Sequence, residues 1–343
     1  MRPFDYRRAA TLEEAMAAGP GALLLAGGTN LLDLMKLDVA RPSALIDIGG
    51  LPGLDRVEEA EGGLRIGALV PNADLARNAE ILARYPAVAE AVLSGASGQL
   101  RNAATTGGNV MQETRCSYFQ DVLSPCNRRV RGTGCGAIGG VTRNHAILGW
   151  TEGCIATHPS DLCVALAAYD AVVEIAGPTG RREVPMEIFH SVPDAEGAGP
   201  PPLAQGEVIT HIRLPGSGGM ARHARYVKLR ERTSFAFAIV SAAAALDMRD
   251  GRILAARLAL GGVAARPWRC REAEEALKGA APGEDAFAAA VALSLANAAP
   301  SGDNAAKIPL AGRIAILALT RAALGTPTRL PALPASVFEG DAP

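Results

Sequence analysis

The sequence predicts an α+β fold built from two parts that join near residue 220. In the first part, short apolar segments typical of strands alternate with short helical segments, without a clean β–α–β repeat. After the Gly-rich linker Pro215–Gly219, strands are followed by helices, which is typical of a separate α+β domain. We therefore expect domains over 1–219 and 220–327, and an extended Pro-rich tail over 328–343.

The elements of the first part follow from local signals. Thr11–Glu14 reads "TLEE", a capping box that opens a short helix. The apolar run at 22–26 predicts a buried strand that ends in a glycine turn, and 31–36 predicts a short helix. Further strands are expected at 44–51, 63–70, 145–150, 171–177 and 207–215, and helices at 72–78, 87–98 and 159–169.

The second part begins with long apolar segments. Strands are expected at 224–230, 235–248 and 252–263, and helices at 284–298 and 309–324. The stretch 190–207, between the strands expected at 171–177 and 207–215, is rich in Pro and Gly and predicts a surface loop.

Composition excludes several classes of function. The chain has 343 residues, a net charge of -1 and 4% aromatic residues, which argues against nucleic acid as a partner. No apolar segment reaches the ~18 residues of a membrane span. The N-terminal stretch 1–16 is charged and lacks an apolar signal core, so we expect no export through a signal of its own.

The turn between the first long strand and its helix contains two glycines and two small polar residues, Gly27–Asn30. Backbone N–H groups that lack covering side chains bind phosphate in such turns, although an ordinary turn reads the same way. A second glycine-rich, polar stretch spans 94–110. Two such loops can clasp a long phosphate-bearing cofactor, and the alternative is two surface loops. Neither G-x-G-x-x-G after a strand nor a P-loop motif is present.

Four of the six cysteines lie in one excursion, with gaps of nine, eight and eighteen residues: Cys116, Cys126, Cys135 and Cys154. Structural zinc sites use closer pairs, so zinc is the weaker interpretation. Disulfides remain an alternative in an oxidising compartment. A cubane iron–sulfur cluster allows wide spacing, and the arginines and glycines of this segment suit an anionic cluster, although solvated arginines would look the same.

The other two cysteines differ in their surroundings. Cys163 falls within the apolar predicted helix 159–169 and is expected to behave as a small buried hydrophobe. Cys270 lies far along the chain, in the second domain. We therefore select the four cysteines of the excursion, 112–154, as the metal ligands.

Taken together, "AGGTNLLDLMK", "GASGQLRNAATTGGN", the cysteine excursion, "CIATHPSDL" and "YVKLRERTSFAFAIVS" resemble the FAD-binding medium subunit of the xanthine dehydrogenase, or molybdenum hydroxylase, family. The similarity runs over nearly the whole chain. Its cysteine spacing is most similar to the branch of bacterial periplasmic aldehyde oxidoreductases.

The resemblance implies a PCMH-type FAD domain of two subdomains and a C-terminal domain like that of carbon monoxide dehydrogenase flavoprotein. It implies FAD and a [4Fe-4S] cluster in this chain. The enzyme would be a heterotrimer, with molybdopterin cytosine dinucleotide on a large subunit and two [2Fe-2S] clusters on a small one. Aldehyde and water would become carboxylate at molybdenum, and electrons would pass to FAD and an external acceptor. Export would rely on the small subunit, which places the complex in the periplasm; the alternative is the cytoplasm.

The resemblance also assigns the site residues. The first glycine turn would lie against the FAD pyrophosphate, and "HPSD" matches the family's Ser-Asp element. Lys228 alternates with its strand neighbours and would be a cationic FAD contact, although a solvated strand lysine reads the same way. Ile209, or its neighbour Val208, would pack on the cofactor. The assigned residues are Leu23, Leu24, Leu25, Ala26, Gly27, Gly28, Thr29, Asn30, Leu31, Thr105, Gly108, Asn109, Ser160, Asp161, Ile209 and Lys228.

None of these residues is expected to act as an acid or base on the substrate, because flavin chemistry belongs to the cofactor. Two other functions remain open at this point. One keeps the family but makes the partner a CoA-ester reductase or a carbon monoxide dehydrogenase. The other is a non-catalytic binding module braced by a Cys116–Cys154 disulfide.

Overall fold

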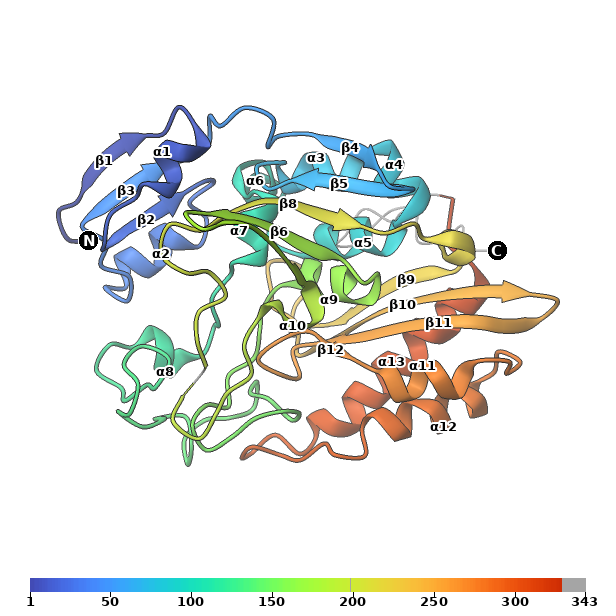
Figure 1. The fold of residues 1–343 in the computed structure, drawn as a ribbon. Helices are drawn as coiled ribbons and strands as arrows, with labels where there is room; N and C mark the ends of the chain where they lie inside the picture. Colours follow the sequence, from blue (N-terminus) through green and yellow to red (C-terminus); the bar gives the residue numbers. More distant parts are fainter. Residues whose placement is uncertain (198, 329–343) are drawn as a thin grey trace.

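The computed structural model describes residues 1–197 and 199–328 and contains three sheets (Figure 1). The tail predicted over 328–343 therefore lies, apart from its first residue, outside the described residues. No helix within the described ranges is long and apolar enough to cross a membrane.

The first sheet is small and parallel, in the order β1-β3-β2. Thr11 caps its first helix as the capping box predicts, because the Thr11 hydroxyl accepts the Glu14 N–H at 3.2 Å. The strand predicted to be buried is only half-buried, with Leu23 40% exposed, because it lies at an edge of three short strands. The elements are β1 (Asp5–Arg8), α1 (Leu12–Met16), β2 (Ala22–Leu25), α2 (Leu31–Lys36) and β3 (Ala44–Asp47).

The second sheet is antiparallel, in the order β4-β5-β8-β6-β7. Helices α5 and α9 are covered on nearly all sides and form the centre of the largest hydrophobic core. The strands are β4 (Val57–Ala60), β5 (Gly63–Gly67), β6 (Val172–Gly177), β7 (Gly180–Pro185) and β8 (Val208–Leu214). The helices are α3 (Asn72–Arg77), α4 (Ala79–Arg84), α5 (Pro86–Ser94), α6 (Gly98–Ala103), α7 (Thr106–Val110), α9 (Asp161–Ala168) and α10 (Met186–Phe189).

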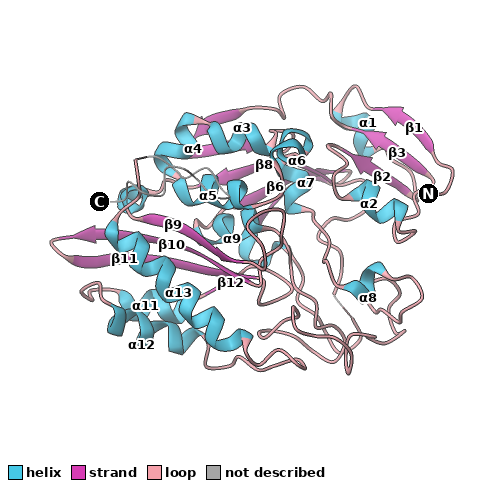
Figure 2. Ribbon diagram, turned by 180° about the vertical axis from the view of Figure 1, so that it is seen from behind, coloured by secondary structure: helices cyan, strands magenta, loops and turns pink. Residues whose placement is uncertain are grey.

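The third sheet, in the order β12-β11-β10-β9, has helices on both faces (Figure 2). Along β10, Ala242 and Ala244 pack with α13, whereas Ala243 and Ala245 pack with α5 and α9. This alternation follows from the period of two in a strand, and the small side chains let both helix layers approach the sheet. The elements are η1 (Gly218–Arg222), β9 (Ala224–Leu229), β10 (Val240–Arg249), β11 (Arg252–Gly261), β12 (Trp268–Arg269), α11 (Arg271–Leu277), α12 (Glu284–Ser294) and α13 (Lys307–Leu324).

The cysteine excursion forms a lobe of loops around the short helix α8 (Ser117–Gln120) (Figure 1). The strand predicted at 145–150 is wrong: Ile147 and Leu148 donate their N–H groups to one carbonyl, that of Val263, and form no ladder. The strand predicted from 235 begins only at Val240, because 230–239 form a loop in which Phe235 has a positive φ of 48°. Both segments border the site described next.

Candidate flavin site and cysteine centre

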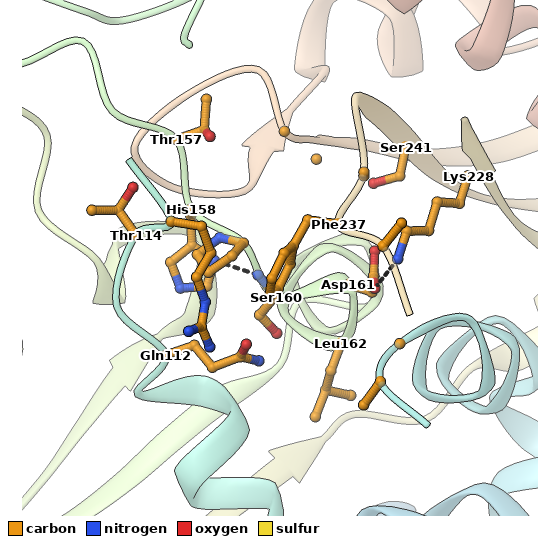
Figure 3. Close-up of a pocket in the computed structure, with 18 of the residues that line it drawn as sticks. Gln112, Thr114, Thr157, His158, Ser160, Asp161, Leu162, Lys228, Phe237 and Ser241 are labelled. Atoms are coloured by element: carbon orange, nitrogen blue, oxygen red, sulfur yellow. Dashed lines mark hydrogen bonds and ion pairs between the residues drawn. The ribbon is translucent and has the colours of Figure 1, made fainter. Parts of the chain in front are cut away.

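A cavity of about 840 Å³ opens between the segments that connect the elements of the three sheets. This volume is within the range of cofactor pockets. Its walls come from the start of α2, from the α6–α7 region, from 157–162 at the start of α9, and from the β9–β10 loop. Figure 3 shows side chains from the last two of these segments, among them His158, Ser160 and Phe237. Segments that are far apart in the sequence therefore line the same cavity.

The second glycine-rich loop and the Ser-Asp element meet through Asn109. The Ser160 hydroxyl donates to Asn109 Oδ1 at 2.6 Å, and Gln112 Nε2 donates to the same oxygen at 2.7 Å. Ser160 also caps α9, because its oxygen accepts the Cys163 N–H at 3.1 Å. The serine that caps α9 therefore also holds the side-chain amide of Asn109 at the cavity wall.

A buried ion pair forms one side of the cavity (Figure 3). Lys228 Nζ lies 2.7 Å from Asp161 Oδ2 and 3.1 Å from the Ser94 carbonyl oxygen. The other Asp161 oxygen accepts the Tyr226 hydroxyl at 2.5 Å. Both charged side chains are almost fully covered, at 3% and 7% exposed. Lys228 is therefore a paired cation on the cavity wall rather than a solvated strand lysine.

The structure separates the predicted cofactor residues into two groups. Lining the cavity are Thr29, Asn30, Gly108, Asn109, Ser160, Asp161 and Lys228. The others are not among its lining residues: Leu23, Leu24, Leu25, Ala26, Gly27, Gly28, Leu31, Thr105 and Ile209. Several of these have a clear structural place. Leu23–Leu25 belong to β2, the Thr105 hydroxyl caps α7, and Ile209 packs in the largest core.

Close contacts and backbone conformation within the protein explain why Gly27 and Gly28 are glycines. A Cβ on Gly27 would lie 1.9 Å from the Ala103 carbonyl oxygen, so this position lets the turn contact the end of α6. Gly28 has a φ of +71°, a conformation that favours glycine. The turn is thereby held against the end of α6, with Thr29 and Asn30 at the cavity.

Arg115 and Phe237 are cavity residues that the sequence reasoning missed. The Arg115 guanidinium donates to Asn30 Oδ1 at 3.0 Å and lies 4.9 Å from the centre of the Phe237 ring. Burial lowers the pKa of Arg115. These contacts connect the turn after β2, the start of the cysteine excursion and the β9–β10 loop. A local sequence pattern cannot predict contacts between residues so far apart in the chain.

Unpartnered buried polar atoms collect at this cavity. Five of the eight such atoms among the described residues belong to residues that line it: Asn72 Oδ1, Arg115 Nε, His145 Nδ1, His158 Nε2 and Ser241 Oγ. A buried polar atom without a partner is costly, and a ligand bearing donors and acceptors relieves that cost. The donor set is mixed and includes a guanidinium, which suits a cofactor that carries phosphates and polar rings.

The four cysteines of the excursion line one small second cavity: Cys116, Cys126, Cys135 and Cys154. Residues Cys126 and Cys135 face each other in an antiparallel bridge, and none of the four forms a disulfide. Burial raises the pKa of Cys116 to about 11, partly offset by the N–H groups of Phe119 and Tyr118. Burial likewise raises the pKa of Cys154. Cys163 and Cys270 instead lie in the two large hydrophobic cores.

A second group of ligand-type side chains adjoins the 840 Å³ cavity, called the flavin-sized cavity from here on, because His158 lines it. Ligand atoms of His158, Cys163 and His190 lie within 4.8 Å of one another. The Ser160 N–H donates to His158 Nδ1 at 3.3 Å, which leaves the proton of the neutral ring on Nε2. His190 Nε2 lies 2.8 Å from the Val110 carbonyl oxygen, and burial lowers the pKa of His190 to about 4. Because the neutral His158 ring has no free lone pair, we interpret the group as a neutral part of the core rather than a metal site.

Comparisons with known proteins agree with this geometry. The family described as "FAD binding domain in molybdopterin dehydrogenase" matches residues 2–217, and "CO dehydrogenase flavoprotein C-terminal domain" matches 225–323. The chain is 46% identical over 330 residues to the aldehyde oxidoreductase FAD-binding subunit PaoB of Escherichia coli K12, covering 94% of this chain and 99% of that one.

More distant relatives show the same fold. The carbon monoxide dehydrogenase medium chain of Hydrogenophaga pseudoflava is 29% identical, over 93% of this chain and 96% of that one. The solved carbon monoxide dehydrogenase of Oligotropha carboxidovorans superposes with a TM-score of 0.74 at 26% identity, over 95% of this chain and 99% of that chain. The resemblance read from the sequence is thus confirmed, and the chain belongs to the FAD-binding medium subunits of the molybdenum hydroxylase family, as a subunit of an oxidoreductase.

Proposed function

We propose that this chain is the FAD-binding electron-transfer subunit of a molybdenum-dependent aldehyde oxidoreductase. The observation that carries the proposal is the 46% identity, over nearly both full lengths, to an aldehyde oxidoreductase FAD-binding subunit. The partners would be a large subunit with molybdopterin cytosine dinucleotide and a small subunit with two [2Fe-2S] clusters. Aldehyde oxidation would occur on the large subunit, and electrons would leave through this chain to an external acceptor.

Bound FAD would supply the conversion of two-electron into one-electron transfer. The part of this chain is to bind and orient it. Thr29 and Asn30 would face its phosphates from the glycine turn, as would Gly108 and Asn109 from the second loop. Asp161 is held rigidly by Lys228 and Tyr226 and offers a fixed acceptor edge. None of these residues is expected to act as an acid or base toward a substrate, because the flavin chemistry belongs to the cofactor.

We also propose that Cys116, Cys126, Cys135 and Cys154 hold a [4Fe-4S] cluster. Support comes from their shared cavity and from the absence of disulfides among the described cysteines. Within the described ranges, the only group with three ligand atoms within 4.8 Å of one another is that of His158, Cys163 and His190. The sulfur atoms of the four cysteines are therefore too far apart to surround a single ion together. A four-thiolate multinuclear centre suits that spacing. Arg128 lines the same cavity and places a cation beside it.

The alternatives lose support to different degrees. The Cys116–Cys154 disulfide of a braced binding module is not formed, and family membership argues against such a module. A carbon monoxide dehydrogenase or CoA-ester reductase partner stays open within the family, and the large subunit would decide it. We further propose the domain division near Met220, and a periplasmic complex co-exported with the small subunit, with the cytoplasm as the alternative.

The test is purification of the complex with its copurifying subunits. We expect non-covalent FAD at one per chain, released by acid, and aldehyde turnover by the complex. A complex that lacks flavin, or that oxidises no aldehyde while turning over carbon monoxide or a CoA ester, would contradict the proposed function.

The cysteine assignment has its own test, by iron content and cluster absorbance. Cys126→Ser should lose the iron of this cluster, but not that of the [2Fe-2S] clusters, while flavin remains. Cys163→Ser is the matched control and should keep iron, since Cys163 is fully covered in the core of α9. Iron retained in Cys126→Ser but lost in Cys163→Ser would show that the wrong cysteines were chosen.

A further inference from the structure

We propose that His145 donates a hydrogen bond to the Cys116 thiolate and thereby raises the reduction potential of the iron–sulfur centre. This inference rests on the proposed cluster and names a residue outside its ligand set. His145 Nε2 lies 3.2 Å from Cys116 Sγ, and its ring borders the flavin-sized cavity. Cys116 lines both cavities. The contact therefore lies in the wall that the two sites share.

The direction of the hydrogen bond follows from the chemistry of the ligand. A cysteine that binds iron is a thiolate and has no proton to give. The only proton available to the 3.2 Å contact is then the one on His145 Nε2.

The structure holds His145 in place from the other domain. Its carbonyl oxygen accepts from Lys307 Nζ at 2.8 Å and from Asn304 Nδ2 at 3.1 Å. The neighbouring Ala146 carbonyl accepts from the Ser301 hydroxyl at 2.7 Å. These donors come from the segment that opens α13, more than 150 residues away in sequence. Three donors on two successive carbonyls fix a backbone that has no strand or helix of its own.

The consequence for the centre is electrostatic. Hydrogen bonds to cluster sulfurs set the potential because they stabilise the more negative, reduced form more than the oxidised form. Loss of the donor should therefore favour the oxidised cluster. We expect the ratio of reduced to oxidised centre, at fixed ambient potential, to fall about tenfold, which is about 59 mV for a one-electron couple.

The experiment compares three substitutions of His145 in the purified complex, with iron content and the cluster's potential, followed by EPR, as readouts. His145→Phe keeps a planar ring without a donor. His145→Gln places an amide N–H near the position of Nε2, whereas His145→Asn is too short to reach the sulfur. We expect the Phe and Asn variants to have the lowered potential and the Gln variant to stay near the native value. His223→Phe is the matched control, because His223 contacts Ala322 and no cysteine.

The outcomes separate this inference from the cluster itself. A native complex whose iron is fully accounted for by the two [2Fe-2S] clusters of the small subunit would refute the cluster in this chain. Iron at native level with an unchanged potential in His145→Phe would refute the role of His145. If the Phe and Asn variants lose iron, retention by the Gln variant supports the donor, and equal loss from all three overturns it.

Discussion

Replacing Lys228 by Met should destabilise the chain more than replacing both members of its ion pair. Lys228 Nζ and Asp161 Oδ2 are 2.7 Å apart, and the two side chains are 3% and 7% exposed. Removing one partner of such a pair leaves an uncompensated buried charge, at a cost of roughly 3–5 kcal/mol. Lys228→Met keeps most of the side-chain volume, so little of this cost comes from a cavity.

The second perturbation removes the orphaned charge. In Lys228→Met combined with Asp161→Asn, a neutral amide replaces the carboxylate, and its oxygen can still accept from the Tyr226 hydroxyl. What remains lost is the bond to the Ser94 carbonyl and the pair itself, together about 1–2 kcal/mol. The double variant should therefore be more stable than Lys228→Met alone by about 2 kcal/mol.

Urea unfolding of the chain expressed alone, followed by the fluorescence of its two tryptophans, measures these differences. The native chain, Lys228→Met, Asp161→Asn and the double variant form a double-mutant cycle. If the two single costs add to within about 0.5 kcal/mol of the double cost, the groups do not interact and the reasoning fails.

Three further predictions concern other parts of the chain. Burial lowers the pKa of Lys307 to about 7, so the unfolded state binds the extra proton above that pH. The free energy of unfolding should therefore rise by up to about 1.4 kcal/mol per pH unit from pH about 8 to about 10 relative to Lys307→Met, and parallel pH profiles would contradict this. Gly27→Ala should lose bound flavin, measured by absorbance, because its Cβ meets the Ala103 carbonyl; Gly98→Ala, which meets nothing within 4 Å, should keep it, and equal retention would count against the turn. The chain purified without partners should not oxidise aldehydes, and turnover by the single chain would overturn the assignment of that step to another subunit.

Short-range signals explain which parts of the fold were predictable. The Thr11 cap, the serine cap of α9 and most helices and strands are set within windows of a few residues, where spacing and capping act directly. The segments 145–150 and 235–239 were misread as strands, because apolar content alone does not provide a pairing partner. Their backbones are fixed by contacts with other parts of the chain instead.

The sequence by itself determined the family, the two glycine-rich loops and the set of cysteines, because each depends on residue identity and order along the chain. Only the tertiary structure decided what those residues contact. Lys228 meets Asp161 across 67 positions, and Arg115 meets Asn30 across 85. His145 reaches Cys116 because a segment opening α13 holds its backbone. Such contacts depend on how the elements pack together. The free energy of packing is a sum over the whole core, so no short stretch of sequence determines it.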